Sequence, residues 1–189
     1  MLKQFFPYEQ VKSVFHIDYE ALYQKGYRGI IFDIDGTLVP HGDGSTPQVD
    51  ELFRHIHGVG LKTLLLSNNN TQRIEQFIQN IDTPYIPDAD KPDPKNYQKA
   101  VLMLDLNLDE VVFVGDQIFT DIRGANRCGM ASILVEFLTY PGESRFSKRR
   151  MVEQCILAYY KMQKSQTHRL GNISLQRSII DNEKEKTVL

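Results

Sequence analysis

The sequence is short of features that would mark whole classes of protein. It has no tryptophan, and its two cysteines are Cys128 and Cys155. This pair lacks the spacing of a metal-binding motif and belongs to no recognisable nucleophile motif. A secreted chain of this size often uses disulfides, so we expect a reduced, cytoplasmic compartment.

The chain has neither a large net charge nor a long hydrophobic run. Lys and Arg number 22 against 24 Asp and Glu, a formal net charge of −2 at pH 7, so we expect no nucleic-acid partner. No stretch approaches the ~20 apolar residues of a transmembrane helix. Residues 1–15 contain Gln, Pro and Glu before a signal-peptide core could form. We expect a soluble protein.

What the chain does contain is an alternation of apolar runs and helical stretches, which is typical of a parallel sheet covered on both faces. We therefore predict an α/β, Rossmann-like fold with a five-stranded parallel sheet and helices on both faces. The predicted strands are 29–34, 62–68, a short one within 83–94, 110–116 and 130–137. The predicted helices between them are 48–60, 72–80, one from Pro94 onward and 120–129.

The length predicts one main domain, residues 1–143, with a C-terminal appendage. Residues 144–170 are predicted to form a basic amphipathic helix, with one acid, Glu153, among many basic residues. It could pack on the core, bind an anionic membrane surface or bind a partner, and the sequence leaves these alternatives open. Residues 171–189 are polar and predict a flexible tail. The apolar side of the predicted helix carries Phe146, Val152, Ile156, Tyr159 and Met162.

Polar residues gather where the predicted strands end. In open α/β sheets, ligands bind beyond the carboxyl ends of the strands, so we expect these residues to share one site. They are Asp33 and Asp35 after the first strand, Ser67 and Asn68 after the second, Lys91 after the third and Asp116 after the fourth.

The pair Asp33 and Asp35 poses an electrostatic problem. Residues two apart on a strand point to the same face, and like charges that close disfavour each other's ionised form. A cation at this position would offset the repulsion, and carboxylate oxygens are ligands that Mg²⁺ accepts. The sequence therefore predicts a magnesium site.

Four stretches resemble the motifs of the haloacid dehalogenase superfamily of aspartate-nucleophile phosphatases, in the right order. They are DIDGT (33–37), LLLSN (64–68), KPDP (91–94) and VGDQIFTD (114–121), and the similarity covers about residues 25–137. More narrowly, SNN (67–69), GDQIFTDIRGANR (115–127) and the stretch 7–38 are similar to the YqeG-type branch of subclass IIIA. That branch is similar to mitochondrial phosphatidylglycerophosphate phosphatases.

The resemblance implies a strand order of 5-4-1-2-3 and a role for each residue. Asp33 would be the nucleophile that forms an aspartyl-phosphate, and Asp35 the general acid and base. For this, the pKa of Asp35 should be raised by Asp33 and by partial burial. The remaining expected roles are Mg²⁺ ligation by Asp33, Asp116 and the Asp35 carbonyl, phosphate binding by Ser67, Asn68 and Lys91, and support from Thr37 and Asp121.

The spacing of the motifs also bears on the substrate. About thirty residues separate Thr37 from Ser67, and about two dozen separate Ser67 from Lys91. Neither interval can house a large cap domain, so we expect an open cleft. Capless relatives often act on large substrates. The resemblance implies phosphatidylglycerophosphate or another large or lipid phosphate, while a small substrate stays open. Peripheral membrane contact through the basic helix, which its amphipathic pattern allows, would suit a lipid substrate.

Each residue also has a plainer interpretation. Lys91 could be a solvated loop lysine, Ser67 and Asn68 could cap the next helix, and Asp121 could be a first-turn acid. A receiver-like phospho-acceptor or a non-catalytic binding module of the same superfamily is the alternative for the whole protein. Receivers carry the phospho-acceptor on a different strand from their acid pair, whereas D-x-D follows one strand here. We therefore predict a Mg²⁺-dependent phosphatase.

Overall fold

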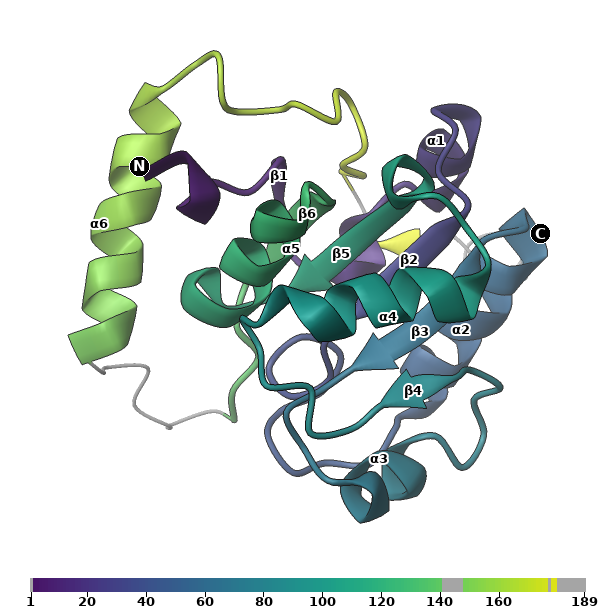
Figure 1. Cartoon of the computed structure of the whole chain (residues 1–189). Helices are drawn as coiled ribbons and strands as arrows, with labels where there is room; N and C mark the ends of the chain where they lie inside the picture. The colour runs from purple at the N-terminus through teal and green to yellow at the C-terminus, as the bar shows by residue number, and fades with distance from the viewer. Residues whose placement is uncertain (1, 141–147, 177, 180–189) are drawn as a thin grey trace.

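The computed structural model describes residues 2–140, 148–176 and 178–179. Its centre is a parallel sheet of six strands in the order β1-β6-β5-β2-β3-β4 (Figure 1). The strands are β1 Glu9–Val11, β2 Gly29–Phe32, β3 Lys62–Leu66, β4 Tyr85–Ile86, β5 Val111–Gly115 and β6 Ala131–Val135. The α-helices are α1 Tyr19–Gln24, α2 Pro47–Val59, α3 Thr71–Phe77, α4 Pro94–Leu104, α5 Arg123–Cys128 and α6 Lys148–Met162.

The predicted fold class and strand order are confirmed, but the predicted number of strands is wrong. Strands β6-β5-β2-β3-β4 reproduce the order 5-4-1-2-3. The sixth strand, β1, pairs with β6 at the sheet edge, with Glu9 opposite Ile133. Its three residues, Glu-Gln-Val, are too few and too polar to produce the apolar run or the alternation that indicates a strand.

The sheet is buried on both faces because successive side chains of each strand point to opposite sides. Ile30 and Phe32 pack with α1 and α2 on one face, whereas Ile31 packs with α4 on the other. Figure 1 shows α4 across the near face of the sheet and α2 behind it. The central strands are therefore almost wholly apolar, and polar side chains begin where the strands end.

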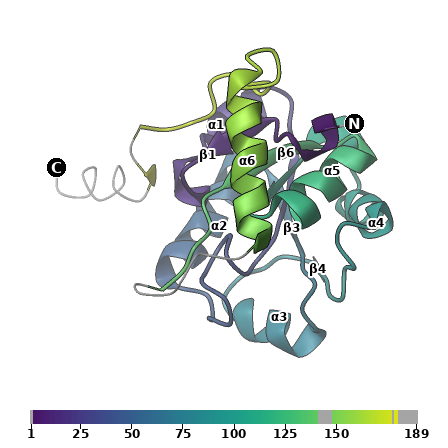
Figure 2. The ribbon, with the colours of Figure 1, turned by 90° about the vertical axis from the view of Figure 1, so that its left-hand side faces the viewer.

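Helix α6 stands beside the edge of the sheet formed by β1 and β6 (Figure 2). Its Leu157 and Tyr160 form a third apolar cluster with Phe6, Ile122 and Leu134. Of the apolar side that we expected from the sequence, Ile156 packs against this cluster. The rest of the described part of that side faces outward, because the core takes the side that carries Glu153, Leu157 and Tyr160. Val152, Tyr159 and Met162 are 50%, 45% and 77% exposed, and Phe146 lies outside the described residues.

The described part of the expected C-terminal tail also differs from expectation. Ile173 and Ile179 are buried in the main core. The backbone N–H of Asp18 donates a 2.9 Å hydrogen bond to the carbonyl of Ile173, and Ser174 forms an antiparallel bridge with Ile17. Isolated apolar residues in a polar segment produce no periodic pattern, so this packing cannot be predicted from the sequence. Residues 177 and 180–189 lie outside the described residues.

The connections at the carboxyl end of the sheet are short. Residues 33–61, between β2 and β3, contain α2, and residues 67–84, between β3 and β4, contain α3. Neither connection forms a cap domain, so the end of the sheet is open, as predicted. No helix in the described ranges is both long enough and apolar enough to cross a membrane.

Candidate active site

The structure brings the predicted site residues together at the carboxyl ends of neighbouring strands. Asp33, Ser67 and Asp116 directly follow β2, β3 and β5, which are adjacent in the sheet. A cavity of about 390 Å³ opens there. Its lining includes five of the predicted residues, Asp33, Asp35, Ser67, Asn68 and Lys91.

Lys91 is a buried lysine that bridges two buried carboxylates. Its Nζ donates to Asp33 Oδ1 at 2.5 Å and to Asp121 Oδ1 at 2.8 Å. Burial lowers the pKa of Lys91, but Asp121 and Asp33 outweigh that effect and raise the pKa above its usual value. The lysine is therefore held in its charged form inside the site and is no solvated loop residue.

The hydroxyl of Thr37 lies between Asp33 and Asp116. Its Oγ1 is 3.4 Å from Asp33 Oδ2 and 3.2 Å from Asp116 Oδ1. Burial raises the pKa of Asp33 to about 6, Asp121 adds to this rise, and Lys91 opposes it. Burial, together with Asp121 and Asp33, raises the pKa of Asp116 to about 8, although Arg150 opposes this rise.

These carboxylates fit a divalent metal ion. Asp33, Asp116 and Asp121 each offer one oxygen, and the three oxygens lie within 4.8 Å of one another. Burial, together with the neighbouring carboxylates, raises the pKa of both Asp33 and Asp116, and a bound cation would favour their ionised forms. Carboxylate oxygens suit a hard cation such as Mg²⁺, so the donor set agrees with the predicted metal.

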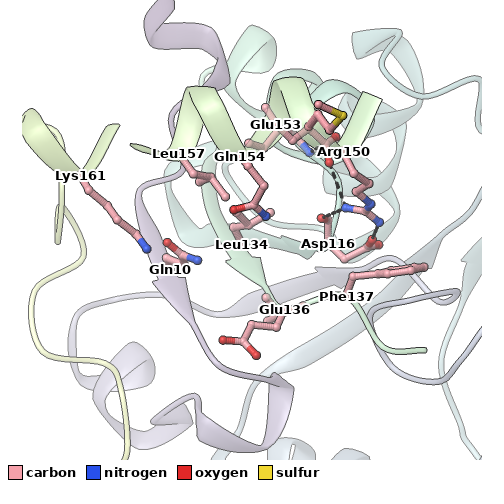
Figure 3. A pocket seen from close by; sticks show the side chains of 13 residues that line it. Gln10, Asp116, Leu134, Glu136, Phe137, Arg150, Glu153, Gln154, Leu157 and Lys161 are labelled. Atoms are coloured by element: carbon pink, nitrogen blue, oxygen red, sulfur yellow. Dashed lines mark hydrogen bonds and ion pairs between the residues drawn. The ribbon is translucent and has the colours of Figure 1, made fainter. Parts of the chain in front are cut away.

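Arg150, at the start of α6, is a site residue that the sequence did not reveal. Its guanidinium donates to Asp116 Oδ2 at 2.5 Å, to the Asp116 carbonyl at 2.9 Å and to Glu153 Oε2 at 3.0 Å (Figure 3). It also stacks on Phe137, 4.2 Å from the ring centroid. The sequence shows a run of basic residues here, but it does not show that the helix folds back onto the end of β5.

Asp35 sits in a second network at the rim of the cavity. It accepts hydrogen bonds from Asn69 Nδ2 at 2.6 Å, from an Arg73 guanidinium nitrogen at 2.7 Å and from the Gly42 N–H at 3.2 Å. Burial raises its pKa, but these hydrogen bonds and the charge of Arg73 outweigh burial and lower the pKa below 3.8. The raised pKa that we expected is therefore wrong for the resting site.

The residues after β3, Ser67 to Asn69, connect Asp35 to Ser67 and hold the loop that carries Lys91. Ser67 Oγ accepts a 2.9 Å hydrogen bond from Asn69 Nδ2, so Asn69 links Ser67 to Asp35. Asn68 accepts a 2.8 Å hydrogen bond from the Lys91 N–H, and it thereby fixes the loop that carries the lysine. Asn69 was part of the quoted SNN stretch, but no role was assigned to it from the sequence.

Two glycines make room for the carboxylates. Gly36 has φ +86°, and a Cβ there would lie 2.6 Å from the Phe137 ring and 3.1 Å from Asp116. A Cβ on Gly115 would lie 2.5 Å from the side chain of Asp121. The turn after β2 and the end of β5 therefore require glycine for steric reasons.

A second cavity, of about 440 Å³, lies between α6 and the edge of the sheet (Figure 3). Arg150 and Phe137 line both this groove and the 390 Å³ cavity at the ends of β2, β3 and β5. Leu134, Val135 and Leu157 supply apolar surface, and Lys161 lies toward the far end of α6. The stacked pair of Arg150 and Phe137 therefore borders both spaces.

Comparisons with known proteins agree with this geometry. Residues 41–129 match the haloacid dehalogenase-like hydrolase family. The chain is 39% identical over 165 residues to "Probable phosphatase YqeG" of Bacillus subtilis, covering 85% of this chain and 95% of that protein. It is 26% identical over 149 residues to the chloroplastic phosphatidylglycerophosphate phosphatase 1 of Chlamydomonas reinhardtii, covering 72% of this chain and 55% of that one.

A solved structure shows the same fold. An uncharacterized protein from Listeria monocytogenes serotype 4b superimposes with a TM-score of 0.50 at 20% identity, over 71% of this chain and 99% of that chain. The relationship to the Bacillus protein spans nearly the full length of both chains, and the four predicted motifs meet at one site. The chain therefore belongs to the haloacid dehalogenase-like hydrolase family, and it is a phosphatase of that family.

Proposed function

We propose that this protein is a Mg²⁺-dependent phosphatase that hydrolyses a phosphate monoester through an aspartyl-phosphate on Asp33. The observation that carries the proposal is that the two carboxylate oxygens of Asp33 contact different partners. One is 2.5 Å from Lys91 Nζ, and the other faces Thr37, whose hydroxyl also reaches Asp116. A carboxylate flanked by a lysine and a metal-type acid can attack an anionic phosphoryl group without prohibitive repulsion.

Asp33, Asp116 and the backbone carbonyl of Asp35 would hold the Mg²⁺. When bound, the ion neutralises charge on the carboxylates and on the phosphoryl oxygens. Asp121, which the sequence assigned to support, keeps Lys91 in place through the 2.8 Å hydrogen bond. Ser67 and Lys91 would hold the phosphoryl oxygens, while Asn68 positions the lysine through the Lys91 N–H.

The reaction then has two displacements at phosphorus. In the first, an Asp33 oxygen bonds to phosphorus, the ester P–O bond breaks, and Asp35 gives its proton to the departing alcohol. In the second, Asp35 removes a proton from water, the water oxygen bonds to phosphorus, and the bond to Asp33 breaks. Phosphate leaves, and Asp35 releases the proton to solvent, because its pKa is lowered in the resting site.

Asp35 needs a proton for the first step, and its resting pKa is lowered. A phosphate monoester carries negative charge, and negative charge nearby favours the protonated form of a carboxyl group. The arriving substrate therefore supplies the upward pKa shift that the resting site lacks. After the alcohol leaves, the hydrogen bonds from Asn69 and Arg73 favour the ionised form that accepts a proton from water.

We propose a lipid or other large phosphate as the substrate, with phosphatidylglycerophosphate as the first to test. The open end of the sheet supports this, because no cap domain among the described residues closes over the cavity. The Chlamydomonas relative is named for that lipid, although this chain spans about half of its length. The cytoplasmic location expected from the sequence stays a prediction.

We also propose that α6 contacts an anionic membrane surface. The outer side of the helix exposes Met151, Val152, Tyr159 and Met162, and its only acid, Glu153, is 3% exposed. The exposed surface of the helix is therefore apolar and cationic, as in helices that lie in the membrane interface. Because Arg149 and Arg150 line the catalytic cavity, a docked helix would hold that cavity near the surface.

Co-sedimentation with vesicles tests this contact. We expect the protein to bind phosphatidylglycerol vesicles and not phosphatidylcholine vesicles, and the double variant Met151→Glu, Met162→Glu to lose binding. The matched control is Leu102→Glu, because Leu102 is 78% exposed on α4. Equal binding of the α6 double variant and the control would refute the membrane contact. A dimer that only the α6 substitutions dissociate would point to a second copy of the chain instead.

A steady-state assay with p-nitrophenyl phosphate tests the catalytic proposal. We expect continuing phosphate release with Mg²⁺, loss of release in EDTA and recovery when Mg²⁺ is restored. One stoichiometric phosphorylation with no further release would instead indicate a receiver-like phospho-acceptor. A substrate panel that includes phosphatidylglycerophosphate in micelles then identifies the substrate class.

A further inference from the structure

Part of the cavity wall has no role in the mechanism above. The cavity is lined by the catalytic residues and also by Gln117, Thr120, Arg149 and Arg150. The first two lie around the start of the π-helical turn Ile118–Ile122, and the arginines lie at the start of α6. The wall is therefore built from the turn that follows β5 and from the first turn of α6.

The two arginines on this wall differ in their contacts. Arg150 donates to Asp116 and to Glu153, so its charge is already matched. Arg149 forms an ion pair with Glu153, but its Nε lies 3.8 Å from Glu153 Oε1, which is too far for a hydrogen bond. Its guanidinium is 5.6 Å from the Phe119 ring centroid. Its side chain is 46% exposed. Among the described residues, no acceptor takes a hydrogen bond from Arg149, and the residue lines the cavity.

The same wall has another unmet polar group. The buried Oγ1 of Thr120 has no hydrogen-bond partner among the described residues, and Gln117 also lines the cavity. The cavity volume of about 390 Å³ corresponds to about a dozen water molecules. It therefore has room for more than one phosphoryl group, and a cation and neutral donors lie beyond the residues that hold that group.

We propose that Arg149, assisted by Gln117, binds a second anionic group on the alcohol part of the substrate. The preferred substrates are then phosphate monoesters whose alcohol also carries a phosphodiester, a phosphate or a carboxylate. An arginine suits this role because its planar guanidinium donates two parallel hydrogen bonds to such a group. The inference rests on the proposed phosphatase function, and it names the substrate class for that function.

Two synthetic substrates separate this inference from the proposed function. One is an alkyl phosphate that ends in a methoxy group, and the other is the same alkyl phosphate ending in a methyl phosphodiester. We expect kcat/KM for the diester to exceed that for the methoxy compound by about tenfold, the ratio of one well-formed charged contact. Arg149→Gln should abolish the preference and leave kcat/KM for the methoxy compound within about twofold of the wild type.

Control variants make the test specific. Lys148→Gln removes a charge from the exposed residue next to Arg149, and it should keep the preference, as Arg149→Lys should in part. Gln117→Ala should reduce it. Equal kcat/KM for both substrates in the wild type, or an equal fall for both in Arg149→Gln, would overturn the inference while the phosphatase function stands. If the wild type releases phosphate from neither compound, the proposed function and this inference fail together.

Discussion

Replacing Asp33 by Asn should abolish turnover and at the same time stabilise the metal-free protein at neutral pH. The folded protein raises the pKa of this carboxyl from 3.8 to about 6, so ionised Asp33 opposes folding. The difference of about two pH units corresponds to about 3 kcal/mol. The Asn amide is neutral and its oxygen can still accept from Lys91, so the variant avoids most of this cost.

The pH dependence of the effect follows from the direction of the shift. Below pH 3.8, Asp33 is protonated in both the folded and the unfolded chain, and the substitution changes little. As the pH rises toward 6, the unfolded chain releases its proton first, so the wild type loses stability. Above pH 6, Asp33 is ionised in both states, and the wild type has lost the full free energy of unfolding that the pKa shift implies. At pH 4.5 the linkage relation gives about one third of the full effect.

Differential scanning fluorimetry in EDTA measures this directly. At pH 7.5 we expect Asp33→Asn to unfold about 3 to 9 °C above the wild type, which corresponds to about 1 to 3 kcal/mol for a chain of this size. At pH 4.5 the difference should shrink, and Mg²⁺ should stabilise the wild type but not the variant. The control is Asp109→Asn, at an exposed acid. A variant less stable than the wild type at pH 7.5, or a gain that does not depend on pH, would refute the reasoning.

Three further predictions concern the residues around Asp33. Lys91→Met leaves two buried carboxylates without their lysine. Urea unfolding at pH 8 should show that the free energy of unfolding falls by about 3 to 5 kcal/mol, and a fall of less than about 1 kcal/mol would contradict the role of the lysine. Arg150→Gln should cost more stability at pH 9 than at pH 6, because Asp116 has a pKa of about 8 and ionises between these values; equal losses would count against the ion pair. Gly36→Ala forces an alanine to φ +86° beside Phe137, so thermal unfolding should show that the free energy of unfolding falls by about 1 to 2 kcal/mol. The rate of phosphate release should fall by a larger factor, and unchanged activity would refute the steric argument.

The central strands and the acid cluster could be predicted from the sequence because both depend on local pattern. Apolar runs end in polar residues, and parallel strands bring their carboxyl ends to one edge of the sheet. Asp33, Asp116 and Lys91 therefore meet as expected, even though 83 residues of chain separate the two aspartates. Their catalytic and metal-binding roles stay predictions.

The features that could not be predicted from the sequence depend on contacts between segments that are distant along the chain. The pairing of β1 with β6 involves three residues, and the burial of Ile173 involves a single side chain in a polar segment. The orientation of α6 depends on Glu153, which turns inward to Arg150 and to the Ile118 N–H. The lowered pKa of Asp35 likewise comes from hydrogen bonds donated by Asn69, Gly42 and Arg73. Asn69 and Arg73 lie 34 and 38 positions along the chain, and no local pattern indicates these contacts.

The most direct test of the central claim is to quench the enzyme with acid during turnover of p-nitrophenyl phosphate and to map the phosphorylated residue by mass spectrometry. The account predicts a phosphoryl group on Asp33, absent from Asp33→Asn and accumulating in Asp35→Asn, which lacks the base for the second step. Turnover with the phosphoryl group on another residue, or with no phosphorylated enzyme in either the wild type or Asp35→Asn, would contradict it.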